Sequence, residues 1–166
     1  MFSLVLGGNK SGKSDFALEL MRGGKSTGTI IVTGKADDLD FNDQIRHHKI
    51  NRDPAVPVIE SDMDLGGVLE SLSDFSGPIL IDSIDFWVFS IFSEHQDKHY
   101  AYFFNVLKDL EKKRIIFVSA EISLGPLPAS SMVRNFARKL GMINQRLAAI
   151  SQELFLVVAG QPLKIK

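Results

Sequence analysis

The chain has 166 residues, 45% hydrophobic and 23% charged, with 6 prolines and 13 glycines; this composition is typical of a compact globular protein, and 1–166 is expected to form a single domain. The 19 basic and 20 acidic side chains give a net charge of −1, so no general positive field would attract nucleic acid, and none is expected as a partner. The absence of cysteine excludes disulfide scaffolds and thiol catalysis and favours the cytoplasm as location.

Apolar runs of strand length recur along the chain, and their consecutive Val, Ile, Leu and Phe residues suit strands buried on both faces. These runs are Phe2–Leu6, Thr29–Thr33, Pro78–Ile81, Arg114–Ser119 and Leu154–Ala159. Segments of helical period lie between them, at Lys13–Met21, Phe41–Lys49, Met63–Asp74, Lys98–Lys112 and Ser130–Gln152. The alternation predicts an α/β fold with a mainly parallel sheet. The short link Gly160–Pro162 before Leu163–Ile165 predicts an antiparallel C-terminal edge strand.

The densest apolar stretch is Phe86–Phe92. It is far shorter than the roughly 20 residues that a membrane-spanning helix needs, and no membrane span is predicted. Its aromatic residues Phe86, Trp87, Phe89 and Phe92 suit the protein core, or a substrate groove or subunit interface.

The strongest motif follows the first predicted strand and matches G-x-x-x-x-G-K-[ST]. Its residues are Gly7, Gly8, Asn9, Lys10, Ser11, Gly12, Lys13 and Ser14. Glycines let the backbone wrap a phosphate, and the following helix presents its N–H groups to the anion. Lys13 is expected to reach the β- and γ-phosphates and Ser14 to hold Mg²⁺. The alternative is a glycine-rich turn with an exposed lysine.

A P-loop needs a carboxylate on the side of the metal, and the end of a neighbouring buried strand is the natural place for it. Asp82 ends the apolar run Pro78–Ile81, so it is the predicted partner of Ser14 at Mg²⁺. A carboxylate at this point also suits a turn or the cap of the next helix. Asp85 is the second choice for the metal.

A basic cluster, Arg46-His47-His48-Lys49 followed by Arg52, lies on and after the predicted helix Phe41–Lys49. Adjacent helical residues point about 100° apart, so the two histidines are poorly placed to chelate one ligand. One interpretation is an exposed helix end whose positive charges complement the helix dipole. The other is that one imidazole is a nucleophile toward a nucleotide phosphate, with the flanking cations balancing charge.

Five segments together resemble the adenosylcobinamide kinase/adenosylcobinamide-phosphate guanylyltransferase family of cobalamin biosynthesis. They read GGNKSGKS, IRHHK-x-x-R, EISLGPLP, NQRLAA and LFLVVAGQPLKIK. The resemblance runs nearly end to end and implies a three-layer RecA-like P-loop fold and a homotrimer. It also implies a bifunctional transferase: ATP or GTP phosphorylates adenosylcobinamide, and GMP then passes from GTP to adenosylcobinamide phosphate through a histidine–GMP intermediate.

The resemblance also implies roles for individual residues. His48, rather than His47, matches the guanylylated histidine, Glu60 matches a carboxylate that contacts the guanine nucleotide, and Asp82 matches the acidic strand residue. The remaining nucleotide-binding positions that it implies are Gly7 through Ser14, Val32, Thr33, Gly34, Lys49, Ile50, Asn51 and Arg52.

Several positions depart from the family pattern, and they bear on recognition of the corrinoid more than on nucleotide binding. They are Gln44, Ala120, Ser123, Arg138 and the stretch 83–87, which normally contains Thr and Asn in the family and here includes Asp85. Two rival functions therefore stay open. One is a small-molecule P-loop kinase without histidine chemistry, and the other is a nucleotide-binding module that has lost its acceptor site.

Overall fold

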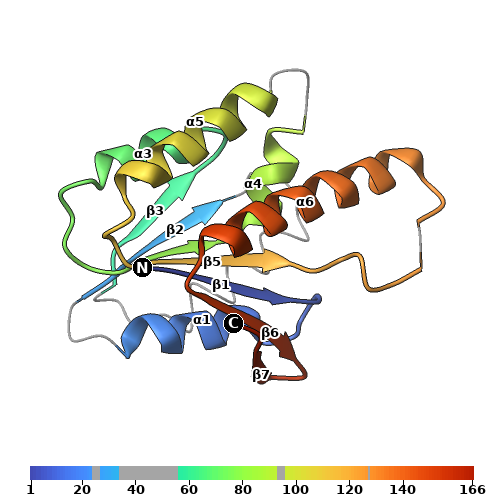
Figure 1. Ribbon diagram of the computed structural model, residues 1–166, viewed down its shortest axis with the longest axis horizontal. Coiled ribbons are helices and arrows are strands. Elements are labelled where there is room, and N and C mark those ends of the chain that lie inside the picture. The colour runs from blue at the N-terminus through green and yellow to red at the C-terminus, as the bar shows by residue number, and fades with distance from the viewer. Residues whose placement is uncertain (24–26, 34–55, 93–95, 127) are drawn as a thin grey trace.

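The computed structural model describes residues 1–23, 27–33, 56–92, 96–126 and 128–166, and these form a layered α/β structure (Figure 1). The strands are β1 (Phe2–Gly7), β2 (Thr29–Thr33), β3 (Val58–Ser61), β4 (Ile79–Asp82), β5 (Ile115–Ala120), β6 (Glu153–Val158) and β7 (Gln161–Lys164). The helices are α1 (Lys13–Arg22), α3 (Leu65–Ser71), α4 (Ile84–Ser90), α5 (Gln96–Asp109) and α6 (Ser131–Ile150).

All of these strands belong to one sheet, in the order β3-β2-β4-β5-β1-β6-β7. Every neighbouring pair is parallel except β6 and β7, which are antiparallel. Ala159 and Gly160 connect that pair with φ angles of 51° and 78°. Two successive positive φ angles match a type I′ hairpin turn, the tight connection that suits twisted strands. The predicted parallel sheet and antiparallel edge strand are confirmed.

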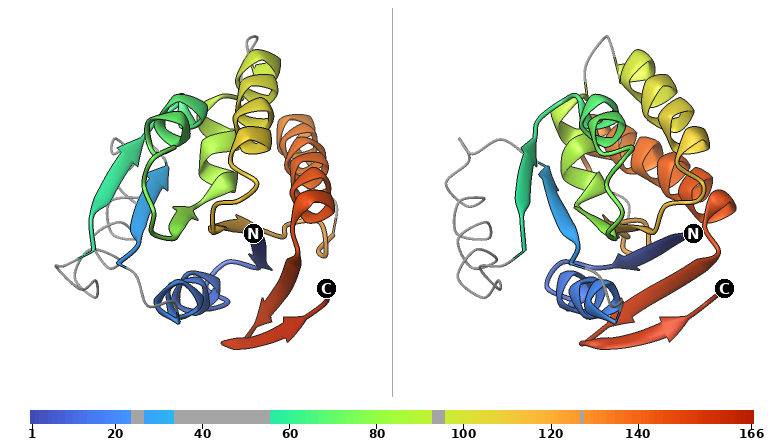
Figure 2. Two further views of the ribbon diagram at one scale, coloured as in Figure 1. Left: turned by 60° about the vertical axis from the view of Figure 1, so that its left-hand side comes forward. Right: turned by 90° about the vertical axis from the view of Figure 1, so that its left-hand side faces the viewer.

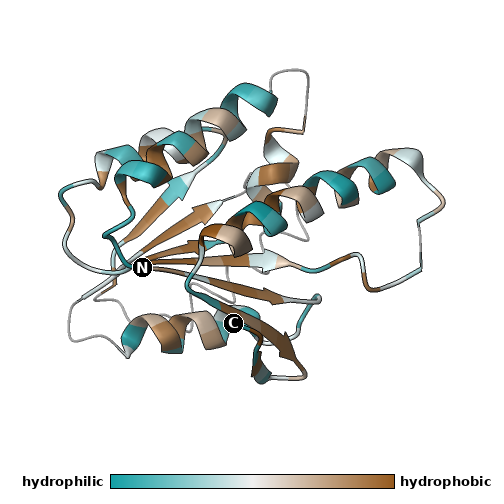
Figure 3. Cartoon of the chain, in the orientation of Figure 1, coloured by the Kyte–Doolittle hydropathy of each residue, from teal (hydrophilic) through white to brown (hydrophobic). Residues whose placement is uncertain are grey.

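Helices cover both faces of the sheet: α3, α4, α5 and α6 lie on one side and α1 on the other (Figure 2). Alternate residues of one strand therefore enter two different hydrophobic clusters. On β5, Ile115 and Phe117 pack in the larger cluster with α3 to α6, whereas Ile116 and Val118 pack with α1. The central strands are apolar almost throughout, while the helices carry hydrophilic residues on their outer sides (Figure 3). This explains the uninterrupted apolar runs.

Helix α4 covers Ile84–Ser90 and so includes most of the apolar stretch Phe86–Phe92, for which no helix was predicted. Its buried residues Ile84, Trp87 and Val88 follow the i, i+3, i+4 spacing of a helix face. The period is obscured in the sequence because Phe86 and Phe89 place further apolar side chains next to these positions. The Trp87 indole N–H donates to the carbonyl of Met63 at 2.9 Å, which satisfies its buried polar group.

Two other elements differ from the prediction. Strand β3 was missed because it is a short edge strand of four residues and carries the charged Glu60. Helix α3 is shorter than the predicted Met63–Asp74, since the Asp64 side chain accepts a hydrogen bond from the Gly67 N–H at 2.9 Å and caps the helix start. The predicted helix Phe41–Lys49 lies outside the described residues. None of the described helices is long and apolar enough to cross a membrane.

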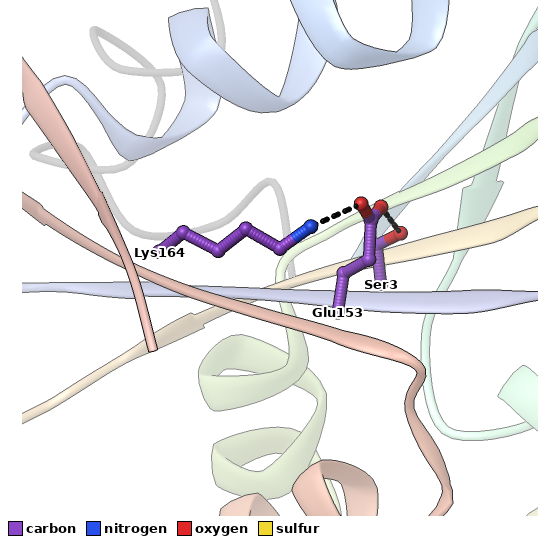
Figure 4. A network of polar contacts seen from close by, with 3 residues as sticks. All are labelled: Ser3, Glu153 and Lys164. Carbon is purple, nitrogen blue, oxygen red and sulfur yellow. Dashed lines mark hydrogen bonds and ion pairs between the residues drawn. The ribbon is translucent and has the colours of Figure 1, made fainter. Parts of the chain in front are cut away.

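A polar network ties the sheet edge together across three strands (Figure 4). Glu153 of β6 accepts a hydrogen bond from the Ser3 hydroxyl of β1 and one from the Lys164 ammonium of β7, both at 2.9 Å. The hydrogen bond from Lys164 lowers the pKa of Glu153, against the opposing effect of partial burial. Folding therefore favours the ionised carboxylate.

Lys164→Met is expected to lower the free energy of unfolding by less than about 1 kcal/mol at pH 7, because exposed ion pairs are weak. A carboxyl whose pKa is lowered by folding stabilises the protein above its unfolded pKa, and this contribution disappears as the pH falls through the folded pKa. The penalty of the substitution should therefore shrink in acid. Urea unfolding of the wild type and the variant, at pH 7 and at acidic pH, measures this loss of unfolding free energy. The exposed Lys112→Met is the control. A loss that does not change with pH would contradict the ion pair between Lys164 and Glu153.

Candidate functional site

The P-loop motif joins the carboxyl end of β1 to the start of α1, as predicted. Gly12 precedes the helix with a φ of 88°, and Lys10 also has a positive φ, of 53°. These conformations curl the backbone, and within the loop the Ser11 N–H donates to the Gly8 carbonyl at 3.3 Å. Gly12 supplies no side-chain cap, so the N–H groups of the first helical turn are left for an anion.

Backbone hydrogen bonds from two distant segments hold this loop. The Glu121 N–H, just after β5, donates to the Gly7 carbonyl at 3.0 Å, and the Gly160 N–H of the β6–β7 turn donates to the Ser11 carbonyl at 2.8 Å. A Cβ on Gly12 would lie 3.2 Å from the Gly160 Cα, so the turn packs directly against the loop. The C-terminal hairpin is therefore part of the site's framework.

Lys13 is the cation of the site and lies at the first position of α1. Its ammonium is 3.3 Å from the Gly8 carbonyl oxygen, so the side chain folds back over the loop. A lysine in this position supplies a positive charge to the phosphates that the loop amides would bind. The loop, the helix start and the lysine together have a geometry and a charge that suit a polyphosphate.

Ser14 and Asp82 meet, although they come from different parts of the sheet edge. The Ser14 hydroxyl donates to Asp82 Oδ1 at 3.3 Å, while β5 lies between β1 and β4 in the sheet. The N-cap residue of α4 is Ser83, so Asp82 is not the helix cap that the sequence also allowed. A hydroxyl and a carboxylate are the oxygen ligands that Mg²⁺ prefers, and they fit an ion that takes its other ligands from phosphates and water. Within the described ranges, no group of three or more His, Asp or Glu side chains could hold a metal ion.

Asp85, the second-choice carboxylate, lies in the wall of the same site. Its Oδ1 accepts a hydrogen bond from the Ala120 N–H at 3.0 Å. Burial raises the pKa of the Asp85 carboxyl, whereas the Ser83 hydroxyl, the charge of Lys13 and the Ala120 N–H act in the opposite direction. Sequence reasoning named Asp85 but not this contact, which joins residues 35 positions apart.

Asn144 of α6 fixes the end of β5 from the helical layer. It accepts a hydrogen bond from the Ser119 hydroxyl at 2.7 Å and donates to the Ala120 carbonyl at 3.1 Å. Asn144 is the first residue of the segment NQRLAA, and the structure shows that it forms structural hydrogen bonds instead of lying on a solvated face. Its neighbour Arg146 instead stacks on Phe104, 3.7 Å from the ring centroid.

The other predicted residues divide between the described and undescribed parts of the chain. Val32 pairs in register with Asp82 on one side and Glu60 on the other. The Thr33 hydroxyl donates to the Ser83 carbonyl and accepts from the Ser83 N–H at 3.1 Å, so it fixes the β4–α4 connection. The predicted residues that lie outside the described ranges are Gly34, His47, His48, Lys49, Ile50, Asn51 and Arg52.

Gly7→Ala is expected to lower the free energy of unfolding by about 1–3 kcal/mol, the usual cost of overpacking. The added Cβ would lie 2.4 Å from Ser11 Oγ and 2.8 Å from the backbone oxygen of Val157 on the neighbouring strand. Gly8→Ala is the matched control, because nothing lies within 4 Å of its Cβ. Urea unfolding of both variants tests this packing, and equal stabilities would refute it.

Comparison with known proteins identifies relatives and a family. The bifunctional adenosylcobalamin biosynthesis protein CobU of Salmonella typhimurium is 29% identical over 182 residues, covering all of both chains. CobP of Pseudomonas aeruginosa, with the same description, is 27% identical over 170 residues, covering 100% of this chain and 98% of its own. The sequence profile of the cobinamide kinase / cobinamide phosphate guanyltransferase family matches residues 3–165. The chain therefore belongs to the cobinamide kinase / cobinamide phosphate guanyltransferase family.

Proposed function

We propose that this protein phosphorylates adenosylcobinamide with ATP or GTP and then transfers GMP from GTP to adenosylcobinamide phosphate through a covalent intermediate on His48. The observation that carries the proposal is the P-loop whose Ser14 hydroxyl meets Asp82 at 3.3 Å beside Lys13. The family match over residues 3–165 and relatives named as bifunctional adenosylcobalamin biosynthesis proteins support the choice of acceptor.

In the kinase step, the cobinamide hydroxyl oxygen attacks the γ-phosphorus, and the bond from that phosphorus to the β,γ-bridging oxygen breaks. The P-loop amides and Lys13 stabilise the negative charge that shifts onto the β-phosphate. Ser14 and Asp82 would hold Mg²⁺, which neutralises phosphate charge when bound. Val32 and Thr33 lie at the same edge of the sheet, since Val32 is in register with Asp82.

In the guanylyl step, a neutral imidazole nitrogen of His48 attacks the α-phosphorus of GTP, and pyrophosphate leaves. A phosphate oxygen of adenosylcobinamide phosphate then attacks the same phosphorus, and the P–N bond breaks to free the imidazole. Lys49 and Arg52, with Ile50 and Asn51 between them, would line the phosphates, and Glu60 would contact the guanine nucleotide. These assignments follow the family resemblance and the positive charge next to the histidine.

We also propose a homotrimer in the cytoplasm. The aromatic stretch supports an interface, because Phe89 is 65% exposed and packs edge-on against Phe136 of α6, 5.9 Å between ring centroids. Met132, one turn earlier on α6, is 64% exposed. Trp87, by contrast, is fully buried. Large apolar side chains gathered on one surface commonly mark a contact with another molecule.

Lys13→Ala is expected to weaken binding of nucleoside triphosphate by at least about tenfold and to abolish turnover, because a charge-assisted contact to phosphate is lost. Equilibrium titration with GTP and ATP measures the affinity. Lys112→Ala, which removes an exposed lysine after α5, is the control and should bind as the wild type does. Equal affinities in the two variants would refute the phosphate site.

His48→Ala is expected to eliminate a covalent guanylyl adduct and GMP transfer while sparing phosphorylation of cobinamide, since only the second step uses the imidazole. Incubation with α-labelled GTP, intact mass measurement and tryptic mapping would locate the adduct. A phosphoramidate should disappear in acid and survive mild alkali, unlike a serine ester.

His47→Ala is the matched control for this experiment and should still form the adduct. Labelling that persists in the His48 variant, or that maps to His47, would overturn the assignment. Active wild-type protein without any adduct would instead favour the simple kinase.

A further inference from the structure

Asp85 is a carboxylate in the phosphate site with no role in the proposed transfer steps, and it belongs to the stretch 83–87 that departs from the family pattern. The Ala120 N–H fixes its Oδ1 at 3.0 Å. Ala120 is paired in register with Gly7, the first residue of the P-loop. Neighbouring strands lie only about 4.8 Å apart. The carboxylate is therefore held beside the loop, across the end of β5.

The position of Ala120 is itself constrained, so Asp85 cannot easily turn away. Asn144 holds the Ala120 carbonyl at 3.1 Å, and the next residue, Glu121, donates to the Gly7 carbonyl at 3.0 Å. β4 ends at Asp82, which is paired with Val118, so β5 extends beyond β4 at this edge. Asp85 accepts the N–H that this extension leaves without a β4 partner.

Burial raises the pKa of the Asp85 carboxyl, and the charge of Lys13 acts in the opposite direction and favours the ionised form. The interaction is mutual, so a negative Asp85 offsets part of the positive potential that Lys13 offers to phosphate. It also repels any anion bound in the loop, and the repulsion grows with the negative charge of that anion. A metal-free nucleoside triphosphate carries more negative charge than its magnesium complex, by the charge of the ion. The repulsion therefore acts more strongly on the metal-free form.

We propose that Asp85 is a specificity-determining residue that disfavours metal-free nucleoside triphosphate in the P-loop and thereby selects the magnesium complex. This inference rests on the proposed function, because it requires nucleotide binding at the P-loop. Asp82 with Ser14 faces the ion, whereas Asp85 acts through its charge on Lys13 and on the phosphates. Asp82 and Asp85 thus have different roles in nucleotide binding.

The test compares binding of the α,β-methylene analogue of GTP, in excess Mg²⁺ and in excess EDTA, at pH 8. Asp85→Asn removes the charge and keeps an oxygen that can accept the Ala120 N–H. It should tighten binding of the metal-free analogue more than binding of the magnesium complex, so that the ratio of the two dissociation constants falls on the order of tenfold. Asp109→Asn changes the net charge equally on the exposed end of α5 and should leave the ratio unchanged.

Asp85→Thr serves as a second uncharged variant if the asparagine variant does not fold, and the same ratio is measured. An unchanged ratio in the folded variant would overturn the inference and leave the proposed function intact. Weaker binding of the magnesium complex would also overturn it, since it would make Asp85 a metal ligand. Failure of the wild type to bind the analogue in Mg²⁺ would overturn the proposed function and this inference together.

Discussion

A phosphate loop works only if its backbone keeps the shape that turns its amides toward the anion, and here that shape depends on hydrogen bonds to its carbonyls. Two of these bonds come from segments far along the chain: Glu121 holds Gly7, and Gly160 holds Ser11. The helix α1 continues from the same loop and packs against the sheet through Ala17 and Met21. Loop, helix and sheet edge therefore form one rigid support on which the chemistry depends.

The strand order determines how the remaining site residues meet. Because β5 separates β1 from β4, Asp82 reaches Ser14 only across the end of an intervening strand. That intervening strand ends in Ala120. Its N–H donates a hydrogen bond to Asp85, and its carbonyl accepts one from Asn144. The edge thus gathers side chains of β4, α4 and α6 around a loop from β1. The positions of Asp82, Asp85 and Asn144 around the loop therefore depend on the point at which β5 ends.

Much of this arrangement could be predicted from the sequence, because buried strands, amphipathic helices and the P-loop leave local patterns. The hairpin turn was predicted from the short link after Leu154–Ala159, and β1 to α1 from the motif itself. Helix α4 was missed because Phe86 and Phe89 mask the spacing of its buried residues. The Asp85–Ala120 and Ser119–Asn144 contacts join distant residues through their hydrogen bonds and leave no local periodicity. His48 lies outside the described residues, so its role stays a prediction from the resemblance.

The contact between Gly160 and Ser11 links the order of synthesis to the order of assembly. Strand β1 is made before both of its sheet partners, because β5 and β6 follow it in the chain by more than a hundred residues. Such long-range pairings close slowly, since the loop entropy must be lost before the contacts form. A nascent chain therefore carries the complete P-loop motif long before it has the hairpin that braces it. The hydrogen bond from Gly160 to Ser11 can therefore form only after the β6–β7 turn has been made.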